Sequence, residues 1–278
     1  MKYKKDILFF TIAFGSKRYF DMANALKNSF EKSNPEFEFK IFNEKFITPK
    51  KQHLKGKKKI FPKDYKYAKF EILKNLNDPN KKYIFIDADS IVLKNLSYLT
   101  NFIKKDVLTI EYKFDGNKGW NKISKYNFVK CCNDSGLDDI KPYSLNGGFM
   151  MWKGKIKCFQ KTIDFLKKYD FNDSKGLTGE EYYLCAAIQH SKTNIFPINY
   201  NRVKLLKLWN FDFRVNNSKI LINNNIINYD IVHYGNFNFY NIHMQRMIKF
   251  YNSNFKLTSM EYFITLLKLI KKMILKYF

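Results

Sequence analysis

The sequence predicts an α/β fold in one large domain, and two kinds of pattern carry this prediction. Two short runs of apolar, β-forming residues, Ile7–Phe14 and Tyr83–Ile86, are typical of buried strands and too short for helices. After the first run comes Gly15-Ser16, and then apolar residues recur at helical spacing at Tyr19, Ala23, Leu26 and Phe30. At 278 residues the chain can build one large core or two small ones.

The same periodicities predict the remaining elements in chain order. We expect strands at Phe37–Phe42, Asp106–Glu111, Ser144–Trp152, Thr193–Ile198, Ile220–Ile227 and Tyr229–His233, and helices at Tyr67–Leu76, Ile156–Tyr169 and Thr178–Ala187. The residues 43–66 and 112–142 carry turn-forming and charged residues and predict loops. No internal repeat and no separate second globular domain is apparent. We therefore expect a main domain over residues 1–257 and a terminal helix over 258–278.

The charge balance is strongly basic, with a formal net charge of +25. This field favours anionic partners such as nucleotide phosphates or an anionic membrane surface. Lysine is less suited than arginine to bidentate recognition of bases, so the composition does not favour a nucleic-acid partner. Only four of the 50 basic residues are arginines: Arg18, Arg202, Arg214 and Arg246.

The cysteine usage and the N-terminus predict a cytoplasmic protein. The four cysteines lack the C-x-x-C spacing of a metal site, which favours reduced structural thiols. The first apolar run is short and lacks a small-residue cleavage site, and no apolar run reaches transmembrane length. The cysteines are Cys131, Cys132, Cys158 and Cys185.

The chemistry-bearing stretch is Asp87-Ala88-Asp89, which directly follows the predicted strand Tyr83–Ile86. In an extended chain, residues two apart point to the same side, so both carboxylates can converge on one point. Two neighbouring carboxylates repel each other and favour a cation or a proton between them. If it is a cation, oxygen ligands suit Mg²⁺ or Mn²⁺. The alternative is a pair of solvated aspartates in a turn.

Three further motifs are candidates for the same site, each with a purely structural alternative. Asn146-Gly147-Gly148 precedes an apolar run, where glycines allow close approach of a ligand or simply bend a strand. Glu180-Glu181 begins a predicted helix, where carboxylates either act as a general base or favour the helix dipole. His233 ends a predicted strand and is either a metal ligand or a structural histidine.

The C-terminal stretch Met260–Phe278 predicts a basic amphipathic helix. Its apolar face lies opposite several lysines, a pattern typical of helices that lie in an anionic membrane interface. Packing on the protein core or on a partner helix is the alternative. The first reading places the protein in the cytoplasm, peripherally on the inner face of a membrane.

The order of these motifs resembles the GT-A-type nucleotide-sugar glycosyltransferases, particularly the glycogenin and bacterial lipopolysaccharide transferase group. The resemblance spans roughly residues 7–235. It implies a Rossmann-like mixed sheet flanked by helices, a UDP-sugar donor with Mn²⁺ or Mg²⁺, and a glycan or lipid-linked acceptor. The residues that carry it are Gly15, the helix with Tyr67-Ala68-Lys69, Asp87 and Asp89, Asn146-Gly147-Gly148, Gly179-Glu180-Glu181, and His233-Tyr234-Gly235.

The resemblance also implies roles for these residues. Asp87, Asp89 and His233 correspond to the metal ligands, Lys69 to a basic residue near the donor, and Asn146 to an asparagine that lines the donor sugar. Gly15, Gly147 and Gly148 fall where the donor is bound. The roles of Glu180 and Glu181 depend on stereochemistry: either one deprotonates the acceptor in an inverting reaction, or both position substrates in a retaining one.

Two departures from the family pattern stand out. The Lys-Pro-Trp that follows the family's histidine is absent, and residues 236–241 stand there instead. Gly179-Glu180-Glu181 replaces the Asp-Gln typical of the retaining enzymes and resembles the base-carrying segment of some inverting ones. The sequence therefore leaves retention or inversion open.

Two other function classes compete with this interpretation. A haloacid-dehalogenase-like phosphohydrolase also carries Asp-x-Asp after a strand, but near the start of its domain and with Thr or Val where Ile91 stands. A basic nucleic-acid-binding protein would explain the charge, but no helix-turn-helix, zinc or RNA-recognition signature accompanies it.

Overall fold

A computed structural model describes residues 4–15, 17–43, 62–113, 132–133, 136, 144–169, 180–198, 205–207, 213–216, 219–222, 225–226, 229–233 and 242–252. The chain forms two compact units, each built from three segments. Unit 1 comprises Met1–Gly15, Glu36–Asp87 and Ser97–Arg202; unit 2 comprises Ser16–Pro35, Ala88–Leu96 and Val203–Phe278.

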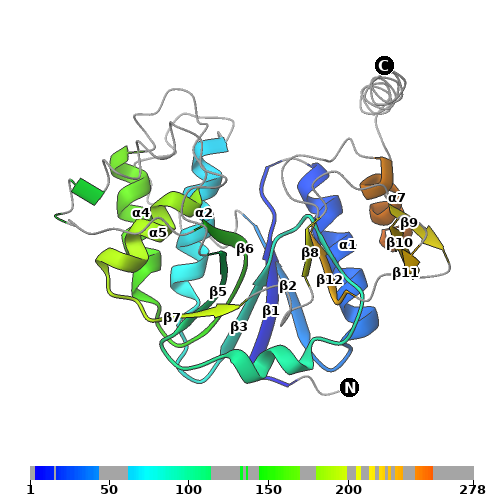
Figure 1. Cartoon of the computed structure of the whole chain (residues 1–278), viewed down its shortest axis with the longest axis horizontal. Coiled ribbons are helices and arrows are strands. Elements are labelled where there is room, and N and C mark those ends of the chain that lie inside the picture. Colours follow the sequence, from blue (N-terminus) through cyan, green and yellow to red (C-terminus); the bar gives the residue numbers. More distant parts are fainter. Residues whose placement is uncertain are drawn as a thin grey trace. The chain divides into compact units, whose positions relative to one another are not determined.

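Unit 1 is built on a six-stranded mixed sheet with the strand order β2-β1-β3-β6-β5-β7 (Figure 1). The strands are β1 (Ile7–Ile12), β2 (Glu38–Phe42), β3 (Lys82–Ile86), β5 (Leu108–Lys113), β6 (Ser144–Lys153) and β7 (Ile195–Ile198). Strand β6 runs antiparallel to β3 and β5, whereas β1 is parallel to β2 and β3, and β7 to β5. All strands except β6 therefore end at one edge of the sheet, the edge where Asp87 follows β3.

Three helices cover one face of this sheet: α2 (Pro62–Asn75), α4 (Lys157–Tyr169) and α5 (Glu180–His190) (Figure 1). The core between them is aromatic, and Trp152 lies at its centre. The indole stacks on Tyr83, meets Phe10 and Phe159 edge-on, and donates a 2.9 Å hydrogen bond from Nε1 to the Leu76 carbonyl. The indole thus links the sheet to α4 and to the residue that follows α2. A short 3-10 helix, η2 (Ser97–Phe102), leads into β5.

The described residues of unit 2 form two small sheets and two helices, α1 (Lys17–Ser33) and α7 (Ile242–Tyr251). In one sheet, β12 (Ile231–His233) lies between β4 (Ser90–Val92) and β8 (Leu205–Lys207). The antiparallel pairing of β12 with β4 places His233 opposite Ser90. The other sheet joins β9 (Phe213–Asn216), β10 (Lys219–Ile222) and β11 (Asn225–Ile226).

Unit 2 ties its first two chain segments together through the buried Asn34, just after α1. The Asn34 side chain donates to the Phe30 and Lys94 carbonyls and accepts from the Leu96 amide at 2.6 Å. Ser29 adds a bond from the Val92 amide. Because Leu96 is 0% exposed, its amide relies on this protein partner rather than on water.

Most predicted elements are confirmed, and the differences have local causes. The single strand predicted over Ile220–Ile227 is wrong: β10 and β11 are separate antiparallel strands with Ile222 opposite Asn225. The two residues between those partners are asparagines, which favour turns over strands. Four elements were not predicted from the sequence: the helix α7 and the strands β4, β8 and β9, which have only three or four residues each.

The predicted C-terminal helix, the boundary at residue 257 and most of the predicted loop over 112–142 lie outside the described residues. Within the described part of the chain, no helix has the length and hydropathy needed to cross a membrane. Cys132, Cys158 and Cys185 are buried and form no disulfide within the described part of the chain. Burial raises the pKa of the Cys132 and Cys158 thiols to about 12, as expected of structural cysteines.

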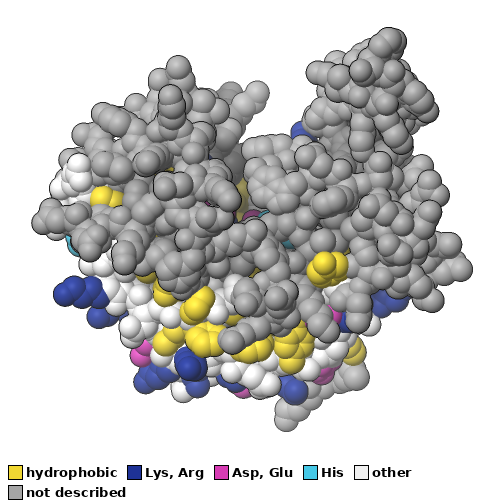
Figure 2. All heavy atoms as spheres, viewed as in Figure 1, with side chains coloured by type: hydrophobic (Ala, Val, Ile, Leu, Met, Phe, Trp, Pro, Cys, Tyr) yellow, Lys and Arg dark blue, Asp and Glu magenta, His cyan; other side chains and the backbone are white. Residues whose placement is uncertain are grey.

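The described basic side chains are scattered over the face shown in Figure 2. On the described part of the face in Figure 2, dark-blue Lys and Arg side chains alternate with acidic, apolar and neutral ones. They do not gather there into a continuous stripe of the kind that nucleic-acid-binding proteins present.

Candidate functional site

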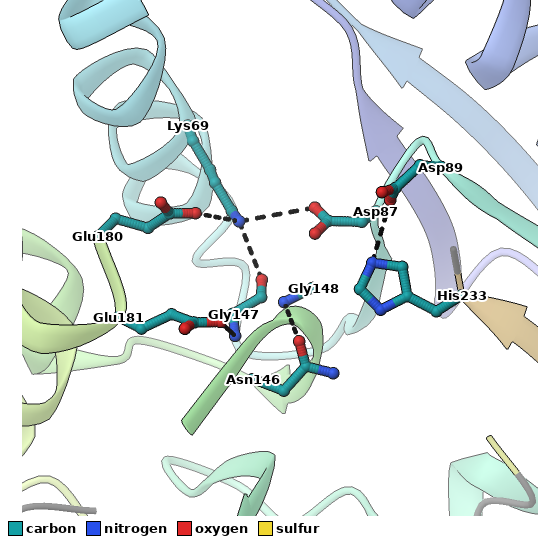
Figure 3. Close-up of polar contacts among 9 residues, drawn as sticks. All are labelled: Lys69, Asp87, Asp89, Asn146, Gly147, Gly148, Glu180, Glu181 and His233. Atoms are coloured by element: carbon teal, nitrogen blue, oxygen red, sulfur yellow. Dashed lines mark hydrogen bonds and ion pairs between the residues drawn. The ribbon is translucent and has the colours of Figure 1, made fainter. Parts of the chain in front are cut away.

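Seven of the predicted site residues gather in unit 1, at the sheet edge where β3 ends (Figure 3). They come from four places in the chain: α2, the end of β3, strand β6 and the first turn of α5. They are Lys69, Asp87, Asn146, Gly147, Gly148, Glu180 and Glu181. The structure thus brings these chain segments together, while the roles of the residues in binding or catalysis stay predictions.

An irregularity in β6 shapes this cluster. Neighbouring β5 residues Ile110 and Glu111 pair with Met150 and Asn146, so Gly147, Gly148 and Phe149 face no partner on β5. We call Gly147 and Gly148 the glycine bulge. A bulge leaves backbone groups outside the ladder and bends the strand, so both glycines can hydrogen-bond elsewhere.

Every backbone polar group of the glycine bulge has a partner within unit 1. The Gly147 amide donates to Glu181 Oε1 at 3.1 Å, and its carbonyl accepts from Lys69 Nζ at 2.9 Å. The Gly148 amide donates to Asn146 Oδ1 at 3.0 Å, and its carbonyl accepts from the Asp87 amide at 2.8 Å. The glycine pair therefore does more than bend the strand, because four other residues hydrogen-bond to its backbone.

Lys69 lies at the centre of the charged groups. Its ammonium is 3.1 Å from Glu180 Oε1 and 3.6 Å from Asp87 Oδ1, and it lies 4.9 Å from the centroid of the Phe85 ring. Burial alone would lower the pKa of Lys69, but the negative charges of Asp87 and Glu180 outweigh burial and raise the pKa well above its ordinary value. Lys69 is therefore a fixed cation at neutral pH.

Glu180 and Glu181 occupy the first turn of α5, which suits carboxylates through the helix dipole. Both also make contacts that the dipole does not require, Glu180 with Lys69 and Glu181 with the Gly147 amide. Burial raises the pKa of Glu180, but the charge of Lys69 and hydrogen bonds to the carboxylate lower it on balance. A lowered pKa makes Glu180 a weak base near neutral pH.

This shift gives a pH-dependent contribution to folding. Because the pKa of folded Glu180 lies below its ordinary value of 4.5, its ionised form stabilises the fold above pH 4.5, and this stabilisation disappears as the pH falls through the lowered pKa. We expect Glu180→Gln to be less stable than the wild type at pH 7, with the difference shrinking below about pH 4.5. Urea unfolding of both proteins between pH 3 and 7 measures the difference in unfolding free energy. A difference that grows on acidification would contradict the lowered pKa of Glu180.

The other two predicted metal ligands meet in unit 2. His233 Nε2 lies 3.0 Å from Asp89 Oδ1 (Figure 3). The pairing of β12 with β4 explains this contact, because it places His233 opposite Ser90, the residue after Asp89. The short strand β4 was missed by the sequence analysis, and its β-branched pair Ile91-Val92 was the available signal.

Two further residues complete the account. Gly15 follows β1 and has φ of 78°, a left-handed conformation that favours glycine; its predicted contact with a donor stays a prediction. Lys66 precedes Lys69 by three residues on α2 and lowers the pKa of Glu180. Sequence reasoning missed Lys66, although i and i+3 spacing places both lysines on one side of the helix.

Comparison with known proteins gives a fold and no sequence relative. The sequence matches no protein-family model and no curated protein. The structure is similar to the galactosyltransferase LgtC in complex with donor and acceptor sugar analogues, with a TM-score of 0.51 and 12% identity over 91% of this chain and 98% of LgtC. An active-site variant of LgtC gives the same values.

A second similar structure is the bifunctional glycosyltransferase WbbM in its apo form. Its TM-score is 0.50 with 10% identity, over 94% of this chain and 52% of WbbM. At such identities the likeness establishes the fold alone. The chain has the α/β fold of the GT-A glycosyltransferases, with a mixed sheet flanked by helices, and the predicted fold class is confirmed.

Proposed function

We propose that this chain is a metal-dependent glycosyltransferase that moves a sugar from a nucleotide diphosphate sugar to a hydroxyl of a glycan or glycolipid acceptor. The observation that carries the proposal is the placement of Asp87 directly after β3, at the sheet edge of a GT-A fold where open α/β sheets bind ligands. The likeness to LgtC, which was solved with donor and acceptor sugar analogues, supports a donor and an acceptor sugar.

The donor set of the proposed metal site suits a hard divalent cation. Asp87 and Asp89 supply carboxylates and His233 an imidazole, a combination that could hold a metal ion. Only Ala88 separates the two aspartates, so the chain itself keeps their carboxylates within reach of one ion. Mn²⁺ or Mg²⁺, when bound, would supply the positive charge that offsets the negative charge developing on the leaving diphosphate.

The residues of unit 1 would bind and orient the donor. Lys69 holds Asp87 and Glu180 in place as a permanent cation, and the glycine bulge carries the backbone onto which the donor sugar would fit. Asn146 and Gly15 are proposed to line the donor site as well. The donor is proposed to be a UDP-sugar, because the family that the motifs resemble uses UDP-sugars.

The two glutamates are unequal as candidates for a general base. The lowered pKa of Glu180 reduces its ability to take a proton from an acceptor hydroxyl at neutral pH. For an inverting reaction, Glu181 is the better candidate of the two. For a retaining reaction, both would act by holding other groups in position.

The proposed acceptor and the proposed location of the protein rest on the sequence alone. The basic amphipathic pattern of Met260–Phe278 supports a lipid-linked acceptor reached from the cytoplasmic face of a membrane. Nucleic acid is not a proposed partner.

A panel of nucleotide sugars, each with and without Mn²⁺, tests this function. We expect one nucleotide sugar with Mn²⁺ to raise the melting temperature by about 5 °C at saturating concentration. The same donor should be hydrolysed slowly to sugar and nucleotide diphosphate. Phosphate release from simple phosphoesters would instead indicate a phosphohydrolase, and salt-dependent binding of nucleic acid without any response to the panel would indicate a nucleic-acid-binding protein.

A further inference from the structure

The glycine bulge is held by side chains where a regular strand would be held by its neighbour. Because β5 offers no partner at Gly147, Glu181 accepts the hydrogen bond from the Gly147 amide and Lys69 donates one to the Gly147 carbonyl. The two side chains come from different helices, α5 and α2, so both the amide and the carbonyl of Gly147 are held by side chains. Unpaired backbone groups in such a place would be costly, and this contact with Glu181 therefore helps to set the shape of the bulge.

The glycine bulge is also hydrogen-bonded to the backbone of Asp87. The next carbonyl along the chain, that of Gly148, accepts the 2.8 Å hydrogen bond from the Asp87 amide. Beyond this point β3 has ended, so this bond fixes the backbone of Asp87 just outside the strand. Glu181 is thus connected to the Asp87 backbone through two hydrogen bonds and the single peptide linkage between Gly147 and Gly148.

We infer that Glu181 is a positioning residue whose carboxylate, by holding the Gly147 amide, fixes the glycine bulge and through it the backbone of Asp87. The consequence for metal binding rests on the proposed function, in which Asp87 is a metal ligand. The inference assigns Glu181 a task that needs a hydrogen-bond acceptor and no proton transfer. A general base needs a group that takes up a proton, so the two roles require different chemistry at one position.

Two substitutions separate these roles. Glu181→Gln keeps an oxygen acceptor for the Gly147 amide but cannot act as a base, whereas Glu181→Met keeps similar bulk and removes the acceptor. The matched control is Glu71→Gln on α2, another partly buried glutamate of unit 1, whose partners are Tyr67 and Lys74. It tests the loss of one carboxylate outside the cluster.

The readouts are the dissociation constant for Mn²⁺ without donor and the hydrogen-exchange rate of the Asp87 amide. We expect Glu181→Met to weaken Mn²⁺ binding by about tenfold, a loss typical of mutations at residues that support metal ligands indirectly. The same variant should accelerate hydrogen exchange at the Asp87 amide. Glu181→Gln should stay within about threefold of the wild type in Mn²⁺ affinity and in the exchange rate of the Asp87 amide, since it preserves the acceptor. Glu71→Gln should match the wild type in Mn²⁺ affinity and Asp87 exchange.

Two results would overturn the inference. One is wild-type exchange at Asp87 together with wild-type Mn²⁺ affinity in folded Glu181→Met; the other is a large loss of kcat in Glu181→Gln with unchanged Mn²⁺ binding, which would identify a base. If Glu181→Met does not fold, Glu181→Ala, which also removes the acceptor for the Gly147 amide, takes its place with the same readouts. A wild-type protein that binds no Mn²⁺ would defeat the proposed metal site, while the exchange rates would still test the positioning role.

Discussion

Replacing Asp89 by alanine is expected to reduce metal-dependent sugar transfer and donor hydrolysis by about a thousandfold, since a bound cation contributes several kcal/mol to charge stabilisation. Asp89 contacts His233 at 3.0 Å, so its removal also takes away the partner that orients the imidazole. The side chain is partly exposed, and we expect the fold to be retained. Steady-state kinetics over a Mn²⁺ titration, with circular dichroism for the fold, measures both effects.

The control for this experiment is Asp164→Ala. Asp164 lies on the exposed side of α4, where Gln160 donates to it, and removing it deletes one carboxylate without touching the proposed site. It should keep wild-type activity. Undiminished transfer by Asp89→Ala at every Mn²⁺ concentration would remove Asp89 from the metal site.

The features that the sequence predicted well are local in the chain. Tyr83–Ile86 is a buried strand, and Asp87 follows it directly, because four consecutive apolar residues and a change to carboxylates are visible without knowing any neighbour. The same holds for Glu180 and Glu181 in the first turn of α5, since a helix N-terminus has a recognisable composition.

The partners of these residues were not predictable from spacing. The bond between Glu181 and Gly147 joins positions 34 residues apart, and that between Lys69 and Gly147 joins positions 78 apart. Both depend on the register shift between β5 and β6, which leaves Gly147 without a strand partner. A shift of register between two strands cannot be read from the alternation of apolar and polar residues along one of them. A glycine pair alone therefore indicates flexibility but not which residues surround it.

The contact between His233 and Asp89 illustrates the same limit. The resemblance to a known family implied that the two act together, but the residues themselves showed only a histidine at the end of a strand. What brings them together in unit 2 is the antiparallel pairing of two three-residue strands, β4 and β12. Strands of this length are stabilised by their neighbours rather than by their own sequence, which is why β4 was missed.

Replacing Lys69 by methionine is expected to destabilise unit 1 by about 3 kcal/mol, because it leaves carboxylates in a poorly solvated place without their cation. The value belongs at the lower end of the range for buried pairs, since the Glu180 and Asp87 side chains remain 24% and 33% exposed. The Gly147 carbonyl also loses its hydrogen bond. Chemical denaturation at pH 7 measures the change, and activity should fall with it.

A second substitution shows whether charge is the cause. In Lys69→Met/Glu180→Gln the carboxylate nearest to the lost cation is neutral, so much of the stability lost in the single variant should return, and the two substitutions should be clearly non-additive. Additive losses would mean that Lys69 stabilises unit 1 through contacts other than its attraction to Glu180, such as the contact of its ammonium with the Phe85 ring. A Lys69→Met protein as stable as the wild type would show that the carboxylates of Asp87 and Glu180 tolerate each other without a cation. Electrostatic repulsion would then no longer be a reason to expect a divalent ion beside Asp87.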